Sequence, residues 1–173
     1  MGVLFLCDTA EYSCAYGSWN IIRMELLYAS IRYLENKIVL HNTQVNSLLD
    51  QEHQPPNQIK KKDLIDTREY DEIQKILIKI KKTTDLDDFI DIVSSQGHDI
   101  EDFFIQHNLG GLWAIMNKND DRGCYSPGNA LDIVMLFKYV YDFIENKNVQ
   151  ERIPQLKRLF IHSMSSRQFI RII

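Results

Sequence analysis

The chain has 173 residues, of which 45% are hydrophobic and 25% are charged, and its formal net charge is −4. This apolar content excludes an intrinsically disordered chain, and the acidic balance argues against nucleic acid as a partner, because phosphates require a basic surface. No apolar stretch reaches the roughly 20 residues that span a bilayer, so we expect no membrane partner. The three cysteines, an odd and sparse count, predict free thiols and a cytoplasmic protein.

The N-terminal part of the sequence predicts one strand followed by helices. Residues 2–7 are a short apolar run typical of a buried strand, and the small residues of 8–18 are typical of a loop. The broad apolar face over 19–35 predicts a central helix, which the segment 41–52 can continue. Two prolines and three lysines in 53–62 predict a solvated loop.

The remainder predicts further helices and two short strands. Amphipathic helices are expected from about 69 to 82 and from 84 to 97, and a short one follows Asp99. The apolar run 112–116 predicts a second short strand or a buried apolar segment, and 117–125 predicts a loop. A second apolar helix is expected over 127–145, a last helix from Pro154, and a third strand in the tail 168–173. The expected fold is mainly α: a compact, bundle-like single domain over 1–173, with about six helices around two apolar central helices and two or three short β-strands.

Two short segments near the N-terminus resemble motifs of phosphoryl-transfer enzymes, but each lacks a residue that the reaction needs. The run VLFLC that ends at Cys7 resembles the strand entering the phosphate loop of low-molecular-weight tyrosine phosphatases, in which an arginine follows six positions later; Ser13 stands there. Without the guanidinium there is no bidentate clamp for a phosphoryl group. Asp8 resembles the first aspartate of the haloacid dehalogenase motif, but Ala10 replaces the second.

The metal-like patterns are also incomplete. Residues 117–123 alternate like an EF-hand loop, but Gly128 stands where calcium needs a bidentate glutamate. His98 and Asp102 would share a helix face, yet two ligands do not hold a divalent ion. We therefore expect no metal and no cofactor. Cys124 precedes a predicted helix N-terminus, a position that can activate a thiol, so a cysteine enzyme stays an alternative.

The clearest signal is the distribution of charge. Between Lys82 and Lys118 there is no lysine or arginine but there are seven acidic residues, and the flanking segments are net positive. The acidic residues alternate with apolar ones at helical spacing, which predicts an exposed surface with an aromatic residue beside it. We call this set the acidic surface: Asp85, Asp87, Asp88, Asp91, Asp99, Glu101, Asp102 and Phe103.

This pattern favours a non-catalytic protein-binding module, an inhibitor, immunity or adaptor protein that covers a basic surface of another protein. Complementary charge raises association rate and selectivity. Two alternatives stay open: a small enzyme with a Cys124 or His/carboxylate site, and a structural subunit of a larger assembly. A pocket in which cysteine, histidine and carboxylate converge would favour the enzyme. An exposed apolar patch above about 400 Å² would favour the subunit.

Reversing charge on the acidic surface tests the electrostatic hypothesis. The double substitution Asp87→Lys with Asp88→Lys should slow association with the partner by about tenfold or more, because steering by opposite charge is lost. Added salt should weaken binding of the unmodified chain. Stopped-flow association kinetics measure both effects, and unchanged kinetics for the double variant would remove the acidic surface as a docking site.

Overall fold

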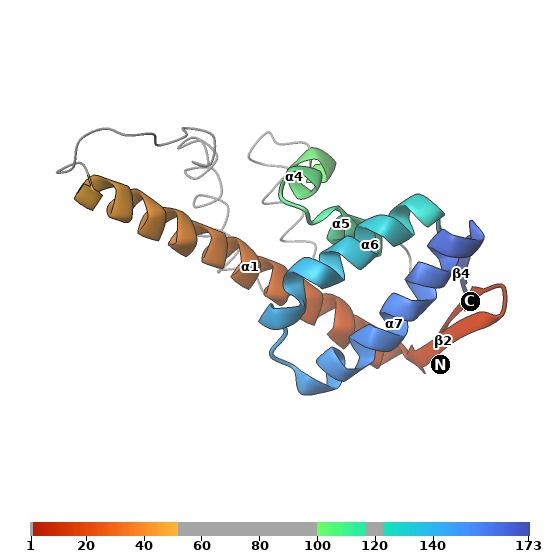
Figure 1. Cartoon of the computed structure of the whole chain (residues 1–173). Coiled ribbons are helices and arrows are strands. Elements are labelled where there is room, and N and C mark those ends of the chain that lie inside the picture. Colours follow the sequence, from red (N-terminus) through yellow and green to blue (C-terminus); the bar gives the residue numbers. More distant parts are fainter. Residues whose placement is uncertain (1, 52–99, 117–122) are drawn as a thin grey trace.

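The computed structural model describes residues 2–51, 100–116 and 123–173 (Figure 1). Within them, helices cover one face of a four-stranded antiparallel sheet of order β2-β1-β4-β3. The elements are β1 (Gly2–Cys7), β2 (Ala10–Ala15), α1 (Tyr16–Gln51), α4 (Ile100–Gln106), α5 (Gly110–Met116), β3 (Gly123–Tyr125), α6 (Pro127–Val140), the 3-10 helix η1 (Tyr141–Phe143), α7 (Lys147–Ser166) and β4 (Ile170–Ile172). The two chain ends lie near each other at the sheet.

The expected bundle of about six helices is wrong, because a sheet forms one side of the core. The described residues hold five α-helices and four strands. The strand expected at 112–116 is part of helix α5, since a short apolar run fits a buried helix as well as a buried strand. The segments expected as loops contain β2 and β3, which are strands because they pair with β1 and β4. The expectations of strands at 2–7 and in the tail are confirmed as β1 and β4.

The helix boundaries differ from expectation at the C-terminal end. Helix α1 is continuous, so the segment after residue 40 does extend the first central helix. Helix α7 begins at Lys147 and not at Pro154, because the side chain of Asn146 caps it by accepting a hydrogen bond from the Val149 N–H at 3.3 Å. The loop 53–62 and the helices expected over 69–97 lie outside the described residues. In the described part of the chain, no helix combines the length and hydrophobicity required to cross a membrane.

Strands β1 and β2 form a tight hairpin. Cys7 pairs with Ala10, so the loop has only two residues. Its first residue, Asp8, has φ 52°, the left-handed conformation that two-residue hairpin loops favour because it matches the strand twist. At the other end of the chain, Arg167 has φ 58° and ends α7. The chain then reverses into β4, which pairs with β1.

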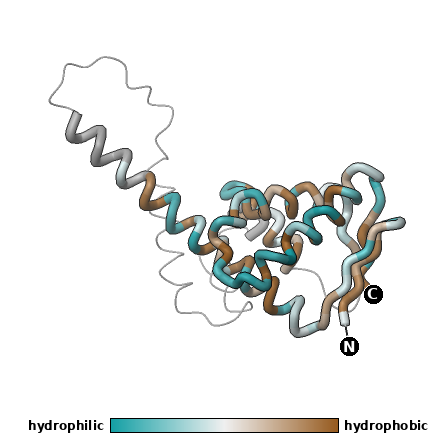
Figure 2. Tube along the Cα trace, turned by 60° about the horizontal axis from the view of Figure 1, so that its bottom comes forward, coloured by the Kyte–Doolittle hydropathy of each residue, from teal (hydrophilic) through white to brown (hydrophobic). Residues whose placement is uncertain are grey.

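The buried face of the sheet carries an aromatic cluster. Phe5 lies in the centre, with its ring centroid 4.7 Å from Trp19 of α1, 6.0 Å from Tyr12 of β2 and 6.5 Å from Tyr125 of β3. Edge-to-face and offset packing of such rings adds about 0.5–1.5 kcal/mol per pair beyond burial. Hydrophobic and hydrophilic residues alternate along the helices (Figure 2), so each helix turns an apolar side to this core.

A carboxylate on α1 fixes the connection that leads into α7. Glu25 accepts hydrogen bonds from the Glu145 N–H at 2.8 Å and the Asn146 N–H at 3.4 Å, and it pairs with Arg32 at 3.2 Å. Arg32 also donates to the carbonyl oxygen of Phe143 in η1. These contacts hold the start of α7 against α1 and so set the direction in which α7 runs under the sheet.

Helices α5 and α6 approach so closely that one glycine cannot carry a side chain. A Cβ atom at Gly111 would lie 2.3 Å from the carbonyl oxygen of Asp132 and 2.6 Å from the Cα of Ile133. Both obstacles are backbone atoms and cannot rotate away. At the adjacent Gly110, the nearest atom would be the Cγ1 of Ile105 at 3.4 Å, an ordinary contact.

We therefore expect Gly111→Ala to destabilise the fold by about 1–3 kcal/mol or more, as overpacking does in well-packed cores. The matched variant Gly110→Ala should be neutral or slightly stabilising, because alanine favours helix over glycine by up to about 1 kcal/mol. Urea unfolding followed by circular dichroism measures both. Equal stabilities of the two variants would contradict the close packing of α5 on α6.

Candidate functional site

Most of the acidic surface falls outside the part of the chain that the structure describes. This is the case for Asp85, Asp87, Asp88, Asp91 and Asp99. Of the remaining members, Glu101, Asp102 and Phe103 belong to α4, where Asp102 is exposed. The structure does not bring the set together, and the acidic surface stays a prediction based on the charge pattern.

The residues considered for enzymatic chemistry do not form a site in the described ranges. Cys124 is exposed on strand β3, which β4 separates from β1, and its cross-strand neighbour is Arg171 of β4. His107 is buried at the end of α4, with 2% of its surface exposed. Residues 2–51, 100–116 and 123–173 contain no group of three or more His, Cys, Asp or Glu side chains that could hold a metal ion.

Among the described strands, β2 lies at an edge of the sheet, and the pairing identifies its outer main-chain groups. Leu4 and Ile173 exchange hydrogen bonds, N–H to O, at 3.1 and 2.9 Å. In an antiparallel pair, every second residue of a strand forms main-chain hydrogen bonds to the same neighbouring strand. Leu4 and Leu6 of β1 therefore form theirs with β4, and Val3, Phe5 and Cys7 form theirs with β2. The partners of Leu4 and Leu6 on β2 are Ser13 and Glu11. Their N–H and C=O groups therefore point away from the sheet.

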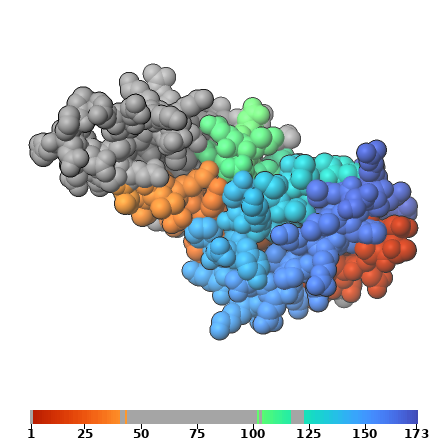
Figure 3. Space-filling view, viewed as in Figure 1, coloured from red at the N-terminus to blue at the C-terminus, as the bar shows by residue number. Residues whose placement is uncertain are grey.

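Helix α7 runs beside this free edge and forms a groove with it. The groove has a volume of about 540 Å³ and is lined by Ala10, Glu11, Tyr12, Ser13, Gln155, Arg158, Leu159 and His162. In the space-filling view, the surface of α7 adjoins that of the N-terminal hairpin (Figure 3). The four α7 residues recur at intervals of three, one and three positions, which places them on a single face of the helix.

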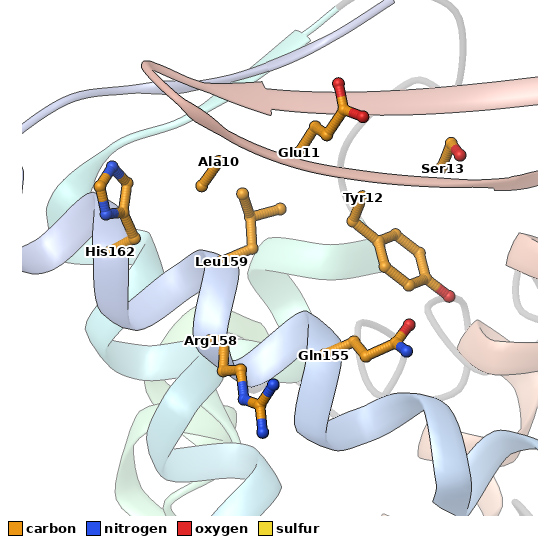
Figure 4. Close-up of a pocket in the computed structure, with 8 residues that line it drawn as sticks. All are labelled: Ala10, Glu11, Tyr12, Ser13, Gln155, Arg158, Leu159 and His162. Carbon is orange, nitrogen blue, oxygen red and sulfur yellow. The ribbon is translucent and has the colours of Figure 1, made fainter.

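The two sides of β2 meet different surroundings. Figure 4 shows the side chains of Ala10 and Tyr12 on the side of α7, and those of Glu11 and Ser13 on the opposite side. Leu159 is buried under the strand, whereas Arg158 is exposed. The groove is thus lined mainly by polar and charged side chains, with Ala10 and the buried Leu159 as its aliphatic members.

Burial keeps two acidic groups beside the groove neutral. It raises the pKa of the Tyr12 hydroxyl above 10.0, and Cys14 adds to the rise while Arg152 lowers it. Burial also raises the pKa of the Cys14 thiol above 9.0, although Arg152 and Tyr12 oppose the rise. Both groups are protonated at neutral pH and do not neutralise Arg152.

The opposite edge of the sheet is a poorer place for strand pairing. Strand β3 has three residues, and only Cys124 has main-chain groups that point outward, because Gly123 and Tyr125 bond toward β4. A second cavity, of about 580 Å³, borders this edge and is lined in part by Cys124, Phe169 and Ile173. It offers one residue for main-chain pairing, against two in the middle of β2.

No model of a known protein family matches the sequence, and no curated protein or solved structure shows significant similarity to it. The groove must therefore be interpreted from its own chemistry. Sequence reasoning missed it, because 8–18 was expected to be a loop. The signal was present: Ala10, Tyr12 and Cys14 alternate with Glu11 and Ser13, the period of two that a half-buried strand requires.

Proposed function

We propose that the chain is a non-catalytic protein-binding domain that pairs an extended segment of a partner protein with the free edge of β2. The observation that carries this proposal is the outward direction of the main-chain groups of Glu11 and Ser13 beside the α7 groove. An edge strand with unpaired N–H and C=O groups is a template for another strand. Natural sheets protect such edges with charged side chains, proline or a bulge; β2 has no proline, pairs in continuous register, and carries Glu11 as its one charged residue.

The groove is needed as well as the edge. Glu11 and Ser13 together offer roughly four main-chain hydrogen bonds, each worth about 0.5–1.5 kcal/mol net. Association costs about 4–15 kcal/mol in lost translational and rotational freedom, so main-chain pairing alone does not give stable binding. Side chains of the partner segment must contribute the rest by entering the groove. In domains that bind by strand addition, main-chain pairing with the edge sets the register of the bound segment, and pockets for its side chains set the specificity.

The proposal is compatible with an inhibitor, immunity or adaptor role, because each of these works by binding alone. The acidic surface is a second contact that we predict on the same chain, directed at a basic surface of the partner protein. The three free thiols, Cys7, Cys14 and Cys124, support a cytoplasmic location, where thiols stay reduced.

Removing one outward N–H tests the proposal. Proline is tolerated in an edge strand where its missing N–H would face solvent, so Ser13→Pro should keep the fold but weaken binding of extended peptides by about tenfold or more. Peptides selected from a displayed library of random linear sequences serve as the probe, and fluorescence anisotropy measures their affinity. Failure of the library to yield a binder, or equal affinity for Ser13→Pro and the unmodified chain, would contradict the proposal.

Two controls keep this test decisive. Ser13→Ala retains the N–H and should bind the selected peptides as the unmodified chain does. If Ser13→Pro unfolds, the change can be made in the peptide instead. Two N-methylated versions of a selected peptide are compared, one methylated at the odd-numbered backbone amides and one at the even-numbered amides. Only one of these two sets of amides faces β2, so one version should lose binding and the other should bind as before. Equal effects in both versions would exclude strand pairing.

A further inference from the structure

The groove beside β2 contains an arginine that the domain itself does not use. Arg158 is exposed on the groove face of α7, and in the described part of the chain its guanidinium makes no hydrogen bond or ion pair. Glu11 is the acidic residue that lines the groove, and its side chain points to the opposite side of the strand (Figure 4). Among the described residues, the positive charge of Arg158 on the α7 side of the groove therefore has no ion-pair partner.

The geometry of strand addition determines which part of a bound segment meets this charge. Successive side chains of a strand point to opposite faces of the sheet. A segment paired with β2 therefore directs every second side chain to the side of Ala10 and Tyr12, and these side chains enter the space between β2 and α7. The intervening side chains lie on the side of Glu11 and Ser13. Gln155 and Arg158, which are exposed in the groove, can thus contact alternate residues of the segment.

We infer that the partner segment carries a carboxylate, from aspartate or glutamate, at a position that faces α7, and that Arg158 binds it. This inference rests on the proposed function and names the chemistry of the partner. A guanidinium presents two parallel N–H donors that match the two oxygens of a carboxylate. Ala10 and the buried Leu159 belong to the same groove lining.

A second copy of the chain is a poorer occupant. Pairing of two β2 edges around a two-fold axis would bring the two α7 helices to the same face of the joined sheet. In its middle turns, α7 carries the cations Arg152, Lys157 and Arg158, against the single acid Glu151. Like charges placed opposite each other oppose association. The same charges favour an acidic segment, so charge complementarity selects a partner peptide over self-pairing.

The experiment uses the full chain and three short peptides in which threonine alternates with glutamate, glutamine or lysine. In these peptides, all ionisable side chains lie on one face when extended. Fluorescence anisotropy should show that the glutamate peptide binds about tenfold more tightly than the glutamine peptide, and that the lysine peptide binds most weakly. Equal affinity for glutamate and glutamine peptides would overturn the inference.

Two charge variants locate the effect. Arg158→Gln should reduce the preference for glutamate over glutamine to nearly one. Lys157→Gln, the matched control, removes the same charge from the neighbouring residue, which does not line the groove, and should keep the preference. A preference that persists in Arg158→Gln, or that falls equally in both variants, would mean that general attraction and not Arg158 selects the acid, and would overturn the inference.

The outcomes separate this inference from the proposed function. If the peptides bind and Ser13→Pro abolishes binding, but glutamate and glutamine are equivalent, strand addition stands and the acidic specificity is wrong. If no peptide binds, or if binding is indifferent to Ser13→Pro, the proposed function itself fails. Sedimentation velocity tests whether a second copy of the chain binds the edge instead. If the unmodified chain is a dimer and Ser13→Pro is a monomer, β2 pairs with a second copy and the inference of an acidic peptide is overturned.

Discussion

The architecture depends on the two edges of one strand. Strand β1 lies inside the sheet and pairs with β2 along one edge and with β4 along the other, so it joins the N-terminal hairpin to the last residues of the chain. Its buried residue Phe5 holds the aromatic cluster against α1. Because a strand has only two edges, this arrangement leaves the outer edge of β2 without a partner among the described strands. The candidate site is a direct consequence of where β1 lies.

The position of α7 turns this edge into a groove. Glu25 of α1 holds the residues that precede α7, and the left-handed turn at Arg167 sends the chain from α7 into β4. Both ends of the helix are thus fixed against elements of the core. Gln155 and Arg158 of this helix line the groove beside β2 and stay exposed. In the function that we propose, the edge of β2 sets the main-chain register of a partner segment and the helix beside it selects side chains.

The sequence was informative where burial alone decides the structure. The apolar runs of β1 and β4 and the broad apolar face of the first helix were predicted correctly, because these residues are buried whatever surrounds them. Strand β2 alternates with the period of a half-buried strand, but its small and polar residues are also typical of a loop, and pairing with β1 is what makes them a strand. Helix α5 was mistaken for a strand, since its packing depends on Gly111 meeting the backbone of α6, a contact between distant parts of the chain.

The candidate site was harder to predict than the fold. Charge counting directed attention to the acidic surface, whereas the groove depends on the spatial relation of β2 and α7, which are separated by most of the sequence. A spacing pattern within α7 shows that Gln155, Arg158 and His162 share a face, but it does not show that this face borders a free strand. The acidic surface stays a prediction from the sequence, and its charge is opposite to that of Arg158 in the groove lining.

Amide hydrogen exchange measured by NMR tests the central claim most directly. In the free protein, the amides of Tyr12 and Cys14 should be protected by their bonds to β1, while those of Glu11 and Ser13 should exchange rapidly. Saturation with a glutamate–threonine peptide should protect Glu11 and Ser13 as the new strand pairs with them. Protection of these two amides in the free protein, or continued rapid exchange at saturation, would contradict strand addition at β2.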